Sequence, residues 1–114
     1  MATRWKIHKE LEDKLRREIK HCVYCRKSMK EYPHRKGTPN DKATWEHIDN
    51  SRWRATSLAV QKANVVRCCG ACNRSKGDKK LAEWLDSEYC KENGIKRSRI
   101  KNRQVLGYLA KRTR

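Results

Sequence analysis

The chain has 114 residues, of which 36% are hydrophobic and 38% are charged, so it is long enough for one small domain with a thin core. Its net charge of +17, from 30 Lys and Arg against 13 Asp and Glu, favours a polyanionic partner such as DNA or RNA over general adhesion to acidic surfaces. Because no apolar run reaches the length of a membrane span and no secretory leader pattern opens the chain, we expect a cytoplasmic protein without a membrane anchor.

The first predicted element is a helix from Trp5 to Lys20. Its apolar residues Leu11, Leu15 and Ile19 recur at roughly helical spacing, and the helix is expected to stop near His21. Residues 30–42 hold two prolines and a glycine and are predicted to form an exposed loop.

Two short strands are expected next, over residues 43–48 and 64–68, with a turn at 49–51. The stretch from Trp53 to Lys62 between them is interpreted as a loop with one helical turn, and Trp53 as a core residue. Residues 69–76 then predict a cysteine knuckle that leads into a short helix.

After Gly77, Asp78 is a candidate cap for a helix that runs to about Asn93, and Gly94 is its predicted stop. A densely basic tail follows, in which spaced apolar residues predict a final amphipathic helix docked on the domain. We therefore expect a single domain over residues 1–114, made of an N-terminal helix (1–21), a core (22–80) and basic C-terminal helices (81–114).

Four cysteines form two Cys-x-x-Cys pairs, Cys22 with Cys25 and Cys69 with Cys72. Two such pairs, more than forty residues apart, can supply the four thiolates of a tetrahedral structural zinc site. In a cytoplasmic chain this is favoured over a disulfide or redox pair. Cys68 would be an alternative ligand to Cys69, although the two-residue gap favours Cys69; Cys90 is expected to be a small buried hydrophobe.

The ordered set Glu46-His47, Asn64 and Cys69-x-x-Cys72-Asn73-x-x-Lys76-Gly77 resembles the HNH endonuclease family over roughly residues 22–80. The resemblance implies an α+β fold with a small ββα-metal core, stapled by the four-cysteine zinc site and flanked by N- and C-terminal helices. It also implies a metal-dependent DNA endonuclease that nicks one strand per active site.

The resemblance assigns a role to each matching position. His47 would be the general base that activates water, and Asn64 would orient the loop that carries it. Glu46 and Asn73 would hold the catalytic cation, and their oxygen atoms favour Mg²⁺ or Mn²⁺. With only two protein ligands, the cation should bind weakly until DNA arrives.

The sequence departs from the family pattern at three points. Glu46 replaces the commoner Asp, Asn73 replaces a frequent His, and Asp49-Asn50 stands where a Pro is common. Asp49 is either a turn residue, which we favour, or an additional ligand.

Lys76 and Arg74 are the predicted DNA contacts, although both could simply belong to a basic face; Arg52 and Arg54 are further candidates. Duplex DNA is the expected partner, and the protein is expected to be a monomer or weak dimer of bacterial or phage origin. The alternatives are a non-catalytic zinc-ribbon module that binds DNA or RNA, an RNA-directed nuclease, and a component of a larger DNA-processing machine.

Overall fold

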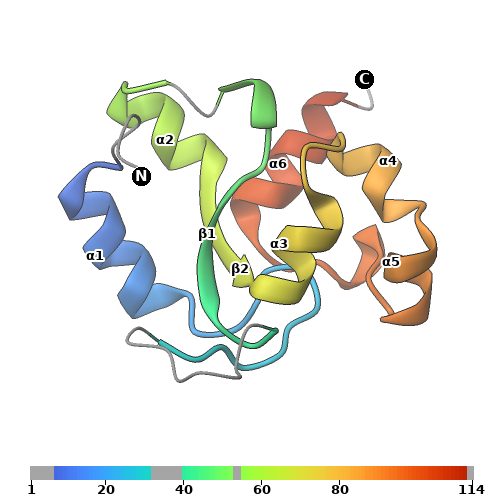
Figure 1. Cartoon of the computed structure of the whole chain (residues 1–114). Coiled ribbons are helices and arrows are strands. Elements are labelled where there is room, and N and C mark those ends of the chain that lie inside the picture. Colours follow the sequence, from blue (N-terminus) through green and yellow to red (C-terminus); the bar gives the residue numbers. More distant parts are fainter. Residues whose placement is uncertain (1–6, 32–39, 53–54, 113–114) are drawn as a thin grey trace.

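A two-stranded antiparallel sheet lies at the centre of the molecule, with helices on either side (Figure 1). Strand β1 (Ala43–His47) pairs with β2 (Val65–Cys69), so that Ala43 lies opposite Cys69 and His47 lies opposite Val65. The computed structural model describes residues 7–31, 40–52 and 55–112. The sheet and the surrounding helices confirm the α+β class that the sequence predicts.

Short helices make up most of the remaining secondary structure. In chain order the elements are α1 (Lys9–Glu18), β1, the 3-10 helix η1 (Asn50–Arg52), α2 (Leu58–Asn64), β2, α3 (Gly70–Lys76), α4 (Leu81–Leu85), α5 (Glu88–Glu92), the 3-10 helix η2 (Arg97–Arg99) and α6 (Arg103–Arg112). Within the part of the chain that the structure describes, every helix is too short or too polar to cross a bilayer.

The two faces of β2 bury different sets of side chains, because successive residues of a strand point to opposite faces. Val65 packs with Leu11 and Leu15 of α1 in a small cluster. Val66 and Cys68 join the larger core, which also contains Trp84. The sheet therefore separates the N-terminal helix from the core that carries the cysteines.

Arg67 attaches α1 and the segment before β1 to the sheet. Its guanidinium donates to the Ile19 carbonyl oxygen at 3.0 Å and forms an ion pair with Glu31 at 2.5 Å. It also lies over the Trp45 ring, with 5.5 Å from the guanidinium carbon to the ring centroid, and Arg16 of α1 lies over the same ring at 5.2 Å. The positive charge of Arg67 is buried, but it is paired and hydrogen-bonded, as a buried charge requires.

Three predicted elements differ from the observed ones. The first helix begins at Lys9 rather than at Trp5; residues 7 and 8 are not helical, and Trp5 lies outside the described residues. The loop expected over 53–62 contains α2, because the Ser57 hydroxyl accepts from the Val60 amide and caps this helix. Trp53 and Arg54 lie outside the described residues, as do residues 32–39 of the predicted loop.

The single helix expected over 78–93 is two helices, α4 and α5. The chain turns at Asp86 and Ser87, where the Ser87 hydroxyl accepts from the Cys90 amide and starts α5. Asp78 does not cap either helix, since α4 begins after Lys80. Gly94 has a φ of +67°, the left-handed conformation expected of a glycine that ends a helix.

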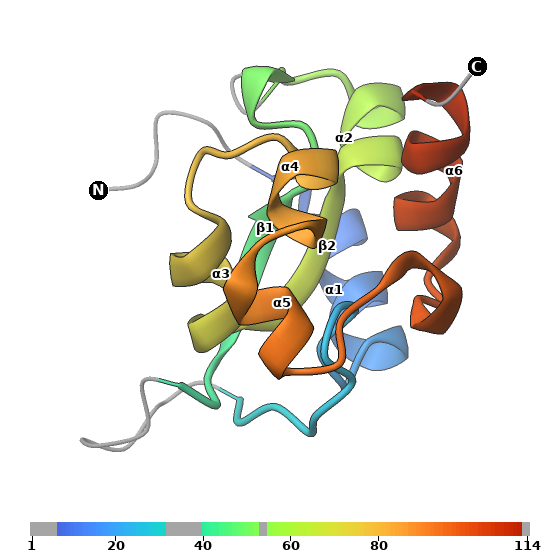
Figure 2. The same ribbon diagram turned by 90° about the vertical axis from the view of Figure 1, so that its right-hand side faces the viewer.

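The final helix is docked as predicted. Ile95, Ile100, Val105 and Leu109 are all buried in the main core. Figure 2 shows α6 beside α2, and these two helices are in contact. The basic C-terminal segment is thus an integral part of the domain, and its apolar side chains close the core behind the sheet.

Candidate metal centre and adjoining polar site

The four cysteines that the sequence singles out gather in one place. The sulfur atoms of Cys22, Cys25, Cys69 and Cys72 all lie within 4.8 Å of one another, and those of Cys25 and Cys69 are 3.8 Å apart. A tetrahedron with zinc–sulfur bonds of about 2.3 Å has sulfur–sulfur edges of about 3.8 Å. The donor set and its spacing therefore fit a tetrahedral metal ion such as zinc, as predicted.

Two local structures bring the sulfurs together. The first pair lies in a tight turn, in which the amides of Tyr24 and Cys25 point at the Cys22 sulfur at 3.4 and 3.5 Å. Arg26 follows with a φ of +68°, and this reverses the chain so that the Cys22 amide reaches the Lys27 carbonyl oxygen at 2.9 Å. The second pair spans the end of β2 and the first turn of α3. The cluster thus joins the turn, the sheet and α3.

The protonation of the thiols indicates how a cation would act there. The pKa of Cys22 lies well below its ordinary value, because the thiols around it, Cys25 foremost, hydrogen-bond to its sulfur. The pKa of Cys72 is raised far above its ordinary value, chiefly because its thiol hydrogen-bonds to that same sulfur. One thiolate thus opposes ionisation of another, and a divalent cation would offset that repulsion and allow all four to ionise.

The two remaining cysteines lie outside this group. Cys68 is buried in the same core, and its sulfur lies 3.7 Å from the Thr44 hydroxyl oxygen. Cys90 is buried in α5, as expected of a small apolar side chain. Of the two alternatives left open by the sequence, Cys69 belongs to the four-sulfur group and Cys68 does not.

Asn64 fixes the loop that follows β1. Its side-chain oxygen accepts from the Asp49 amide at 2.7 Å, and its side-chain nitrogen donates to the Asp49 carbonyl oxygen at 3.2 Å. Its own carbonyl oxygen accepts from the Ile48 amide at 2.9 Å. The Asp49 carboxylate accepts from the Ser51 amide and hydroxyl, an arrangement typical of a turn residue. The backbone directly after His47 is therefore held in place by hydrogen bonds from Ile48 and Asp49 to Asn64 and from Asn64 to Asp49.

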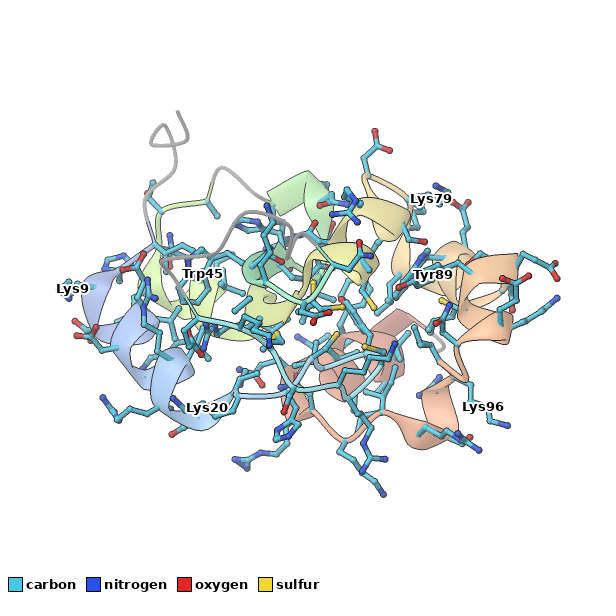
Figure 3. The ribbon with its side chains drawn as sticks, turned by 60° about the horizontal axis from the view of Figure 1, so that its bottom comes forward. Lys9, Lys20, Trp45, Lys79, Tyr89 and Lys96 are labelled. Carbon is cyan, nitrogen blue, oxygen red and sulfur yellow. The ribbon has the colours of Figure 1, made fainter. Side chains whose placement is uncertain are left out.

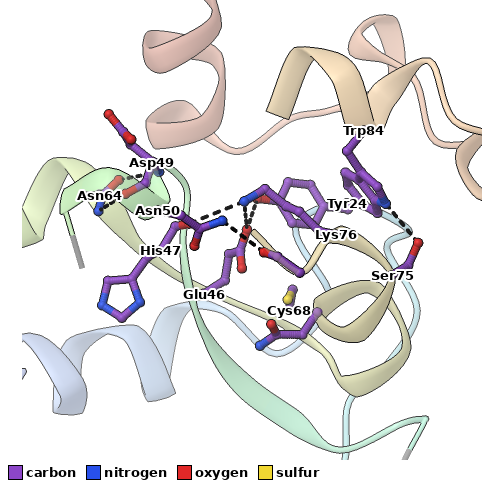
Figure 4. A network of polar contacts seen from close by, with 12 residues as sticks. Tyr24, Glu46, His47, Asp49, Asn50, Asn64, Cys68, Ser75, Lys76 and Trp84 are labelled. Atoms are coloured by element: carbon purple, nitrogen blue, oxygen red, sulfur yellow. Dashed lines mark hydrogen bonds and ion pairs between the residues drawn. The ribbon is translucent and has the colours of Figure 1, made fainter. Parts of the chain in front are cut away.

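His47 ends β1 with a half-buried ring. Figure 4 shows this ring pointing away from Glu46 and Lys76, as expected for neighbouring residues of a strand. The pKa of His47 is lowered, first by burial and then by the positive charge of Lys76. The neutral imidazole, which can accept a proton, is therefore the favoured form near pH 7.

Glu46 points the other way, into a closed polar network (Figure 4). Its Oε2 atom accepts from the Tyr24 hydroxyl at 2.7 Å and lies 3.0 Å from the Lys76 ammonium. Lys76 is 0% exposed and Glu46 is 3% exposed. The pKa of Glu46 is raised by burial, against the opposing effect of Lys76. Nothing in the sequence marks Tyr24 for this contact beyond its place inside the first cysteine pair.

This network corrects one prediction: Lys76 does not lie on the surface, where it could contact a phosphate. It is the last residue of α3, and its ammonium turns inward to Glu46 and approaches the His47 carbonyl oxygen at 3.4 Å. A buried ammonium needs such partners, and the carboxylate of Glu46 supplies the opposite charge. Arg74, in contrast, is exposed and contacts the Asn40 side chain.

Asn73 connects α3 to β1. Its side-chain nitrogen donates to the Thr44 hydroxyl at 2.9 Å and to the Trp45 carbonyl oxygen at 3.2 Å. These contacts hold the helix against the strand. The residues predicted to bind a catalytic cation are therefore close in the fold, but with Glu46 paired to Lys76 the arrangement does not fit a cation held between Glu46 and Asn73.

A cavity of about 670 Å³ lies between α2 and α6, next to the loop that follows β1. Asp49 and Asn64 line one side of it, and three basic residues lie along it: Arg52, Arg103 and Lys111. This cavity could not be predicted from the sequence, because its walls come from helices that are about forty residues apart in the chain.

No protein-family model, curated protein or solved structure matches this chain. Its function must therefore be argued from the residues and their geometry.

Proposed function

We propose that this protein is a DNA endonuclease of the HNH type, in which His47 activates the water that attacks a phosphodiester. The observation that carries this proposal is the pair of hydrogen bonds between the Asn64 side chain and the Asp49 backbone, one in each direction, which holds the loop directly after His47. A non-catalytic module has no need for a half-buried histidine at the end of a strand with an immobilised loop behind it.

The order of the elements supports the same function. β1, β2 and α3 pack together, with the cysteine cluster at the junction of β2 and α3. This is the arrangement that a ββα-metal nuclease needs, with a structural zinc ion bound by the four cysteines. The cluster would keep α3 and the sheet in a fixed relation while DNA binds.

His47 supplies the base chemistry. Its neutral imidazole would take a proton from water as the water oxygen forms a bond to phosphorus, and the bond from phosphorus to the leaving oxygen would break. A divalent cation, Mg²⁺ or Mn²⁺, would supply charge stabilisation at the phosphate.

The charge of the chain suits a DNA substrate. Figure 3 shows Lys9, Lys20, Lys79 and Lys96 around the edge of the molecule, pointing outward. Because the positive charge is distributed in this way, it would attract the DNA backbone without selecting a sequence. We expect duplex DNA as the substrate and one nick per active site.

The test is cleavage of supercoiled plasmid with Mn²⁺, Mg²⁺ or EDTA, comparing wild type with His47→Ala. We expect open circles with either cation, and none with EDTA or with the variant. The variant should still bind DNA as tightly as wild type, as measured by fluorescence anisotropy. His21→Ala is the matched control, because His21 is exposed and lies outside the site. Equal cleavage by wild type and His47→Ala would refute the role of His47.

The second candidate is a zinc-ribbon module that binds nucleic acid without cutting it. One observation favours it: the carboxylate of Glu46 is paired with Lys76 and is not presented to a cation. Tight DNA binding with no cleavage under any of these conditions would select this candidate.

A further inference from the structure

A groove runs along one side of α6. Three cavities of about 670, 460 and 570 Å³ follow one another there, and neighbouring cavities share wall residues: Arg103 belongs to the first two, and Asn102 to the second and third. α2, which lies beside α6 in Figure 2, forms the opposite wall of the first cavity, and the end of α1 borders the other two. We refer to these three cavities together as the α6 groove.

The walls of the α6 groove are strongly basic. They hold eight Lys and Arg residues, all of them exposed, and two carboxylates, Asp49 and Glu18. Arg52 is paired with Asp49 at 3.8 Å, whereas the other seven basic residues have no carboxylate partner among the described residues. Because the protein leaves this positive charge unbalanced, the groove suits an anionic partner.

The residues of α6 that line the first cavity include three on one line. Arg103, Gly107 and Lys111 are spaced four residues apart, so they lie one above another on the same face of the helix. Arg103 and Lys111 are therefore about 12 Å apart along the helix axis. One strand of a DNA duplex advances about 3.4 Å per phosphate, so this distance corresponds to about three or four phosphates. The spacing suits a sugar-phosphate backbone better than a small anion.

Gly107 is an independent indication that a ligand approaches α6 closely. It lies inside the helix, where glycine is less favourable than alanine. A Cβ atom at this position would meet no atom of the described residues within 4 Å, so packing within the protein does not require a glycine. The missing side chain instead leaves an open floor in the first cavity, where a ligand can lie against the helix backbone.

We propose that the α6 groove binds the sugar-phosphate backbone of one strand of duplex DNA, with Gly107 at the point of closest approach. The inference rests on the proposed function, because it gives the path of the same substrate. The first cavity begins at Asp49, in the loop that Asn64 holds directly after His47. A strand that passes His47 would continue past this loop onto α6, so the C-terminal segment would form part of the DNA-binding surface.

The first test measures binding of a fluorescently labelled DNA duplex by anisotropy at a series of salt concentrations. Divalent cations are left out, so that cleavage does not interfere. The groove variant combines Lys62→Gln, Arg103→Gln and Lys111→Gln. We expect it to reduce the slope of log affinity against log salt by roughly 2–3, because each lost phosphate contact removes about 0.9. Its affinity should fall at least about tenfold.

The matched control removes the same charge outside the groove. It combines Lys91→Gln, Lys96→Gln and Arg97→Gln, all at exposed positions, and should change the slope by less than about 1. Equal losses of slope and affinity in both variants would overturn the proposal, since the DNA would then respond only to net charge. A groove variant that loses affinity for an RNA duplex, but not for the DNA duplex of the same sequence, would also overturn it.

A second test separates binding from folding. Gly107→Leu fills the open floor of the groove and replaces a poor helix former with a good one, so its melting temperature should equal or exceed that of wild type. Its affinity for the DNA duplex should nevertheless fall at least about tenfold. Ala110→Leu adds a similar bulk at an exposed position of α6 outside the groove and should bind DNA as wild type does. A folded Gly107→Leu protein that binds DNA as tightly as wild type would overturn the proposal.

The two proposals fail separately. If DNA binding depends on the groove residues but no divalent cation supports cleavage of plasmid, the groove stands and the endonuclease is refuted. If wild type and the groove variant bind and cut DNA equally well, only the groove is refuted.

Discussion

Removal of zinc should unfold this protein. Four sulfur atoms within 4.8 Å of one another connect the first cysteine turn to β2 and α3. Apparent zinc binding to such sites contributes on the order of 10–16 kcal/mol at pH 7. At roughly 0.05–0.15 kcal/mol per residue, a chain of this length has a net stability of about 6–17 kcal/mol. Because the two quantities are similar, little or no net stability should remain without the metal.

The assay combines metal analysis with near-UV circular dichroism before and after treatment with a chelator. The dichroism reports on this region, because Trp84 packs edge-on against Tyr24 at 4.9 Å and the Tyr89 hydroxyl lies 3.5 Å from the Cys72 sulfur. We expect one zinc ion per chain, and loss of the near-UV signal and of cooperative thermal unfolding once it is removed.

Two cysteine variants provide a matched comparison. Cys72→Ser removes a member of the cluster and should reduce zinc content and stability, whereas Cys90→Ser changes a cysteine that is equally buried but outside the cluster and should retain zinc. Protein verified as zinc-free that still unfolds cooperatively, with its near-UV signal intact, would refute the reasoning.

Three further predictions follow from the site and the core. Asn64→Ala should cost about 1–3 kcal/mol in chemical denaturation and reduce cleavage, because the loop after β1 loses its two hydrogen bonds to the buried Asn64 side chain; Asn93→Ala, at an exposed position, should have little effect. Since burial lowers the pKa of His47, the rise of the cleavage rate with pH should occur below about pH 6.5, and a midpoint above that value would contradict the lowered pKa. Leu109→Ala should lower the free energy of unfolding by about 2–5 kcal/mol, as measured by urea denaturation, because Leu109 is buried in the core. Lys111→Ala, on the exposed side of α6, should leave it nearly unchanged. A similar loss of unfolding free energy in both variants would show that Leu109 does not hold α6 on the core.

The sequence predicted those parts of the fold that depend on short-range patterns. The two Cys-x-x-Cys pairs identified the sulfur cluster, and the strands predicted over residues 43–48 and 64–68 match β1 and β2 to within one residue at each end. The break between α4 and α5 was missed, because Leu81, Trp84, Leu85 and Tyr89 have helical spacing across it. The break lies where Ser87 caps the start of α5, and a capping residue is a weaker signal in a sequence than a row of apolar residues at helical spacing.

The site was predicted less fully than the fold. The positions of Glu46, His47, Asn64 and Asn73 in neighbouring elements could be anticipated from their order. The partners of Glu46 could not, because they depend on how deeply β1 and α3 are buried against the first cysteine turn. A lysine followed by a glycine in a basic chain is expected to lie on the surface. The structure shows instead that the Lys76 side chain is completely buried beside the Glu46 carboxylate.

The contacts of Arg67 limit how far this domain can be trimmed. A fragment that begins at Cys22 would contain every residue of the proposed site, but it would lack the Ile19 carbonyl oxygen and the apolar side chains of α1 that cover Val65. The same fragment cut at residue 80 would also lose the four apolar side chains by which the C-terminal segment closes the core. The motif-bearing portion is therefore not a transplantable unit, and grafting it into another protein would require the helices at both ends to be carried with it.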